Sequence, residues 1–210
     1  MSMLKTIAQA WKIADIRKKI IFTLLMLLVF RLGSNIPVPG IDRSILQEVF
    51  SGNTGLFGLF DLFSGGAFSN FTIFALSITP YITASIILQL LTIAVPSLEA
   101  LAKEGTEGKK KIAQYTRYLT VVLAFIQAIG LSVGLFRQAV VSKDFFSITV
   151  IVLTLSAGTA FLMWLGEQIN ENGIGNGISL IIMAGIVSRI PSAFHQTWIK
   201  LTAGEVSVIS

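Results

Sequence analysis

Residues Phe145–Gly166 read FFSITVIVLTLSAGTAFLMWLG and contain no Asp, Glu, Lys or Arg. Two charged residues, Asp144 and Glu167, bracket this run. About 20 consecutive apolar residues in a helix cross the roughly 30 Å hydrocarbon layer of a bilayer. The run therefore predicts a transmembrane helix, and it indicates an all-α membrane protein.

Further runs of the same kind lie on both sides of this one. We expect five spans, at about residues 20–36, 71–95, 118–136, 145–166 and 174–190. The first has a short apolar core, so Arg31 has to extend its side chain toward water. A basic stretch before a short apolar core is also typical of a cleavable signal peptide. No A-x-A-like site follows, and Pro37 and Pro39 favour the end of an uncleaved helix.

The composition excludes several function classes. The chain is 53% hydrophobic and only 13% charged, whereas a soluble domain carries about 25% charged residues. It has no Cys and a single His, His195, so thiol chemistry and multi-histidine metal sites are excluded. The interiors of spans two to five carry no acid, base or His, which ion-coupled transporters and intramembrane hydrolases need. We expect no catalytic residues, no metal and no cofactor.

The basic residues predict the orientation of the chain in the membrane. Lys plus Arg number 16 against 11 Asp plus Glu, and most of them fall on inner segments if the N-terminus is cytoplasmic. Residues 1–19 show helical spacing of apolar side chains, with Trp11 among them, and predict an amphipathic helix on the inner surface. The Lys109–Lys111 cluster favours a solvated loop, although contact with RNA or anionic lipid stays open.

Polar residues and glycines inside the spans predict helix contacts. Pro80 lies near the middle of the second expected span and predicts a kink there. Amides in a membrane favour positions facing other helices, and small residues four apart allow backbones to approach. We therefore expect Gln89 and Gln127 to face other helices. The pairs Gly130/Gly134 and Gly173/Gly177 predict close contacts between helix backbones.

Residues Leu56–Phe63 read LFGLFDLF and are flanked by glycines. The segment is too short to cross a bilayer and too apolar for a solvated loop. It predicts a re-entrant half-helix on the outer side, and an inert interfacial helix is the alternative. An odd number of spans also fits one half of an inverted repeat.

Several long motifs closely resemble the SecY family of bacterial protein-conducting channels, and the resemblance runs over essentially the whole chain from Met3. The motifs are FRLGSNIPVPGID (30–42), FSGGA (63–67), FALSITPYITASIILQL (74–90), KEGTEGKKKIAQYTRY (103–118) and MWLGEQINENGIGNGISLII (163–182). The resemblance implies one half, the N-terminal one, of a ten-helix channel. Residues 20–192 would form this half-channel, and residues 193–210 would lead to the second half.

The resemblance also implies roles for particular residues. The pore ring would comprise Ile78, Ile82, Ile178 and Ile182, and the lateral gate Thr83 and Gln127. The plug would span about residues 54–66 and include Leu56, Phe57, Gly58, Leu59, Phe60, Asp61, Leu62, Phe63, Ser64, Gly65 and Gly66.

The implied function is passage of unfolded secretory preproteins across the bacterial plasma membrane and release of membrane segments through the lateral gate. The implied partners are the C-terminal half of SecY, SecE and SecG, the SecA ATPase or the ribosome, signal sequences and nascent preproteins, and membrane lipid. Two alternatives stay open at this point. One is half of an inverted-repeat transporter for small solutes, and the other is a membrane scaffold.

Overall fold

The computed structural model describes residues 13–42, 44–46, 56–142 and 144–202. The expected amphipathic segment up to residue 12, the first residues of the expected plug range and residues 203–210 lie outside this part. The helices are α2 (Ala14–Gly33), α4 (Leu56–Ser64), α5 (Thr79–Ala94), α6 (Pro96–Lys103), α7 (Thr106–Ile129), the π-helical turn η1 (Gly130–Leu135), α8 (Phe145–Asn172) and α9 (Gly177–Thr202). The expected all-α class is confirmed for the described residues.

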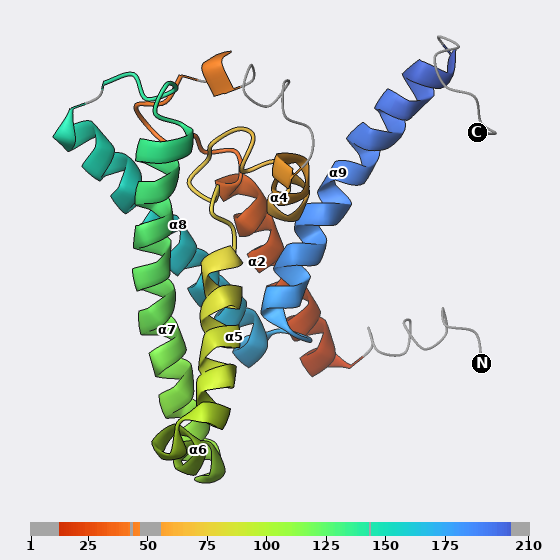
Figure 1. The fold of residues 1–210 in the computed structure, drawn as a ribbon. Coiled ribbons are helices and arrows are strands. Elements are labelled where there is room, and N and C mark those ends of the chain that lie inside the picture. The colour runs from red at the N-terminus through yellow and green to blue at the C-terminus, as the bar shows by residue number, and fades with distance from the viewer. Residues whose placement is uncertain (1–12, 43, 47–55, 143, 203–210) are drawn as a thin grey trace.

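The long helices alternate in direction along the chain (Figure 1). Helices α5 and α7 run side by side, α8 crosses against α7, and α4 lies beside α9 at one end of the bundle. The α7–η1 segment Thr106–Gly134 and α8 are each long and apolar enough to cross a membrane. The pair α5 and α6, bent by 101°, would make a third span if counted as one. The count of five spans therefore stays a prediction.

The second expected span is helical over only part of its length. Its helix begins at Thr79, and the preceding residues form turns in which Phe71 and Ser77 adopt positive φ. Pro80 thus lies in the first turn of α5, where its missing N–H has no helical partner to lose. The predicted kink at Pro80 is wrong. The sharp bend comes instead before Pro96, the first residue of α6.

Most of this irregular segment, residues 67–78, is buried inside the bundle, where it packs against α2 and α8. Phe74 is 2% exposed, and its ring stacks on Phe30 of α2 at 6.1 Å and on Phe161 of α8 at 6.0 Å between centroids. A Cβ on Gly158 would lie 1.9 Å from the carbonyl oxygen of Ile73. Because α8 has only hydrogen there, the segment packs directly against the helix backbone.

Candidate functional site

Three of the four expected ring residues meet at one buried cluster. Ile78, the residue before α5, is 1% exposed and packs in a core that includes Leu162 of α8 and Ile181 of α9. Ile178 and Ile182, one turn apart on α9, pack against the same core. The structure therefore brings residues from the two expected spans together, although they are about 100 positions apart in the chain.

Ile82 has a different environment. It lies one turn beyond Ile78 on α5 and is 38% exposed. Together with Ile178 it borders an open hollow of about 240 Å³ between α5 and α9. The other lining residues are Tyr81, Ser85, Ile86, Asn170, Asn176 and Ser179. Of the four isoleucines, Ile82 is thus the one most available to a passing molecule.

The turn between α8 and α9 fixes the position of Ile178. The side-chain oxygen of Asn170 accepts a hydrogen bond from the N–H of Gly177 at 2.7 Å, and that of Asn176 accepts from Ser179 at 3.1 Å. Such bonds satisfy N–H groups that the first turn of a helix leaves unpaired. Sequence reasoning missed Asn170, whose signal was an Asn shortly before a glycine-rich helix start.

Helix α4 confirms that a short helix forms in the apolar segment after residue 55. Phe60, Leu62 and Phe63 are 41–49% exposed, and the side chains of Leu56, Phe57 and Leu59 lie outside the described residues. The helix ends at Gly65 and Gly66, whose φ angles of +65° and +92° lie in the region that favours glycine. The glycines of the FSGGA motif are therefore the residues that let the chain turn back into the bundle.

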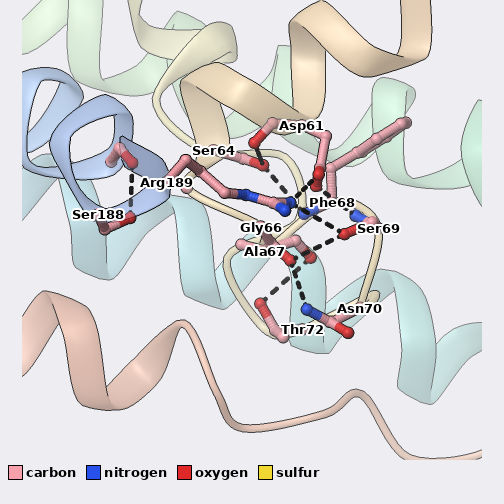
Figure 2. Close-up of polar contacts among 12 residues, drawn as sticks. Asp61, Ser64, Gly66, Ala67, Phe68, Ser69, Asn70, Thr72, Ser188 and Arg189 are labelled. Atoms are coloured by element: carbon pink, nitrogen blue, oxygen red, sulfur yellow. Dashed lines mark hydrogen bonds and ion pairs between the residues drawn. The ribbon is translucent and has the colours of Figure 1, made fainter. Parts of the chain in front are cut away.

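Asp61 organises the turn that follows α4 (Figure 2). Its Oδ1 accepts a hydrogen bond from the N–H of Ser69 at 2.8 Å, and its main-chain oxygen accepts from the N–H of Gly66 at 3.0 Å. Its Oδ2 forms an ion pair with Arg189 of α9, and Arg189 also donates to the hydroxyl of Ser69 at 3.3 Å. Sequence reasoning missed Arg189, because nothing local relates it to a residue 128 positions away.

The backbone of the same turn touches two helices. A Cβ on Gly65 would lie 2.8 Å from the Cα of Gly185, so α9 and the end of α4 meet backbone to backbone. Arg31 of α2 donates to the carbonyl oxygen of Gly65 at 3.0 Å. Arginines from α2 and α9 therefore bind this turn. From the sequence, the turn was recognisable only as the glycines that flank the apolar segment.

The two expected gate residues occupy different surroundings. The hydroxyl of Thr83 donates to the carbonyl oxygen of Thr79 within α5 at 3.0 Å. Gln127 of α7 borders a largely apolar pocket of about 330 Å³ that Thr83 does not line. Phe60 of α4 and Thr79 also border it. Gln127 therefore borders a space shared by α4, α5 and α7.

Charged groups connect the helices at the opposite end of the bundle. Arg117 of α7 pairs with Glu167 of α8 at 2.6 Å. The start of the third expected span and the end of the fourth therefore lie on the same side, as alternating spans require. Within the described residues no group of three or more His, Cys, Asp or Glu side chains could hold a metal ion.

Comparison with known proteins identifies the family. The family model for SecY matches residues 72–210. The chain belongs to the SecY family. Curated relatives named protein translocase subunit SecY are 53% identical over 92% of this chain in Halalkalibacterium halodurans and 52% identical over 93% of it in Bacillus subtilis. This SecY-family chain covers 45% and 46% of those relatives, so it spans about half their length.

Solved structures show the same fold at lower identity. One is described as the structure of a protein-conducting channel, and another as Sec61 in the canine ribosome-channel complex from the endoplasmic reticulum. Each matches with a TM-score of 0.60 and 23% identity, over 85% of this chain and 38% of the other chain. The alternative of a solute transporter gains no support from these comparisons.

Proposed function

We propose that this chain forms the N-terminal half of a protein-conducting channel in the bacterial plasma membrane. It would pass unfolded secretory preproteins and release membrane segments sideways into lipid. The observation that carries this proposal is the convergence of isoleucines from α5 and α9, with Ile82 and Ile178 bordering the same open hollow. Family membership points in the same direction.

The constriction works by exclusion, without any chemical step. Isoleucine side chains bind neither water nor ions, so a narrow ring of them resists ion leakage by dewetting. An extended polypeptide can still displace these side chains, since no covalent or ionic contact opposes it. The driving energy comes from a partner, the SecA ATPase or the translating ribosome, and SecE, SecG and the C-terminal half complete the channel.

Helix α4 would act as the plug, and the pocket at Gln127 would belong to the lateral gate. A nine-residue helix cannot span the bilayer, and its exposed aromatic side chains suit a seal between two halves. The pocket joins α4 to α5 and α7, so a signal sequence that enters beside Gln127 would contact the plug directly. The proposal also includes five spans and a cytoplasmic N-terminus. The ion pair between Arg117 and Glu167 supports the alternation of the spans, because it joins the start of the third expected span to the end of the fourth.

Cross-linking to a translocating chain tests the proposal. A chimera would carry this chain in place of the matching part of Bacillus subtilis SecY, with a single cysteine from Ile82→Cys, because the chain has none of its own. A secretory preprotein with one cysteine would be arrested in the channel. We expect a disulfide to form at position 82.

The control is Val122→Cys on α7, which is 54% exposed and does not border the hollow. Cross-links at position 122 without any at position 82 would contradict the pore assignment and leave the scaffold alternative in first place. The same chimera should also support growth when native SecY is depleted.

A further inference from the structure

We propose that the ion pair between Asp61 and Arg189 is a latch that holds α4 in the sealed position. This inference rests on the proposed function, and it deepens that function by naming the contact that sets the balance between sealed and open channel. Arg189 would act as a positioning residue for α4, reaching it from α9 across the turn that follows the half-helix (Figure 2).

The ion pair between Asp61 and Arg189 is partly buried. The side chains of Asp61 and Arg189 are 13% and 35% exposed, so the carboxylate is largely removed from water. A charge in such a place is costly without a partner. Asp61 has one oxygen on the N–H of Ser69 and the other on Arg189, so both are satisfied in the sealed position.

Ser69 links the two partners of the ion pair, because it binds both Asp61 and Arg189. Its N–H donates to Asp61, and its hydroxyl accepts from Arg189. One guanidinium therefore binds both ends of the segment that runs from α4 through the two glycines to residue 69. Movement of this segment away from α9 would break both of these contacts together, because the guanidinium of Arg189 makes both of them.

The apolar side chains of α4 that the structure describes add little to its attachment to α9. Phe60, Leu62 and Phe63 are 41–49% exposed, and where the turn after α4 meets α9 backbone to backbone the residues are two glycines, Gly65 and Gly185. Apolar stabilisation scales with the area removed from water, and glycines contribute little of it. Among the described side chains, the polar contacts of Asp61 therefore carry much of the attachment of α4 to α9.

A second arginine strengthens the preference for the sealed position. Arg31 binds the carbonyl oxygen of Gly65 and lies close enough for its charge to act on Arg189. While Asp61 is seated, its negative charge offsets the repulsion between these two cations. When α4 leaves, the cations lose that carboxylate, so reseating of α4 is favoured.

The test measures ion leakage through the empty channel in liposomes that contain the chimera with its partner subunits. The variant Asp61→Asn removes the charge and keeps an oxygen for the N–H of Ser69, and Arg189→Gln removes the other charge. We expect each to raise the leak about tenfold, in line with the loss of one partly buried charged partner. Arg189→Lys, which keeps the charge, should stay nearer to the wild type.

A double variant distinguishes a latch from two separate effects. If the residues act as a pair, Asp61→Asn with Arg189→Gln should leak no more than either single variant. The matched control is Lys110→Gln, which removes a cation whose pair with Glu107 is about 72% exposed on the other side of the bundle. Its leak should be unchanged, because exposed pairs contribute little.

Preprotein transport by the same liposomes separates the two proposals. Unchanged leakage in the variants, or additive leakage in the double variant, with transport intact would overturn the latch and leave the channel function standing. A folded wild-type chimera that transports nothing would overturn the channel function itself.

The variant Ser69→Ala tests the contribution of Ser69. It leaves the ion pair in place and removes one acceptor of Arg189, so we expect a smaller rise in leakage. An unchanged leak in this variant would count against the cooperative contact.

Discussion

Gly177 of α9 lies directly against Gly166 of α8: a Cβ on Gly177 would be 2.1 Å from the carbonyl oxygen of Gly166. A Cβ on Gly166 would in turn lie 2.5 Å from the Cδ1 atom of Ile178. The two helices can meet at this distance only because neither has a side chain at the contact. The contact therefore sets the position of Ile178 beside the hollow.

Gly177→Ala should destabilise the packing of α8 and α9. The new methyl group meets backbone, which cannot move aside as a flexible side chain can, so we expect a loss of about 1–3 kcal/mol in the free energy of unfolding. Unfolding of the purified chimera in detergent would measure it. Gly130→Ala is the control, since a Cβ there meets no atom within 4 Å apart from the neighbouring backbone of its own helix. Equal losses in both variants would contradict the close contact.

Alanine variants of Ile78 and Ile82 should differ in their effects on protein stability and on ion leakage. Ile78→Ala removes a side chain that is 1% exposed, so we expect a loss of about 2–5 kcal/mol in the free energy of unfolding. Ile82→Ala changes a side chain bordering open space, and stability should stay within about 0.5 kcal/mol. Ion leakage through the assembled channel should nevertheless rise in Ile82→Ala. A tight channel with alanine at position 82 would remove that residue from the constriction.

Thr23→Val should loosen the link between α2 and the turn after α8. The Thr23 hydroxyl accepts from the N–H of Ile174 at 3.0 Å and donates to the carbonyl oxygen of Lys19 at 2.9 Å. Valine has nearly the same shape but leaves the N–H without its acceptor, which costs about 1–3 kcal/mol. Thr23→Ser keeps the hydroxyl and should be close to the wild type. Hydrogen exchange at the amide of Ile174 reports the difference directly.

Acid should weaken the loop around Asp42, outside the expected spans. Hydrogen bonds from the hydroxyl and N–H of Ser44 lower the pKa of the Asp42 carboxyl below its usual value. A group with a depressed folded-state pKa contributes stability above its unfolded pKa and loses it as the pH falls through the folded value. Proteolysis near this loop should accelerate in that acidic range. Asp42→Asn should remove the pH dependence, and an unchanged profile would contradict the assignment.

The glycine pairs show how far sequence reasoning reaches. Both pairs satisfy the same spacing rule, yet only one makes the predicted contact. A Cβ on Gly173 would lie 2.6 Å from Thr23 Oγ1 and one on Gly177 would lie 2.1 Å from the carbonyl oxygen of Gly166, whereas a Cβ on Gly130 or Gly134 meets no atom within 4 Å apart from the neighbouring backbone of its own helix. The spacing states that close approach is sterically allowed. Whether another helix packs against the glycine pair depends on the packing of the whole bundle.

Local composition by itself determined the helical class, the approximate positions of α7 and α8, the short helix in the apolar glycine-flanked segment and the absence of acids, bases and His from the interiors of spans two to five. These properties follow from the length and hydropathy of contiguous runs, which a bilayer constrains directly. The resemblance to the SecY family implied which isoleucines form the ring. It did not distinguish buried Ile78 from open Ile82.

Only the tertiary structure decided the unwound segment before Thr79 and the ion pair between Asp61 and Arg189. Both depend on atoms brought together from distant parts of the chain. The unwound segment persists because Phe30, Phe161 and the bare backbone at Gly158 enclose it. The energy of such contacts depends on three-dimensional proximity, which a linear pattern of residues does not contain.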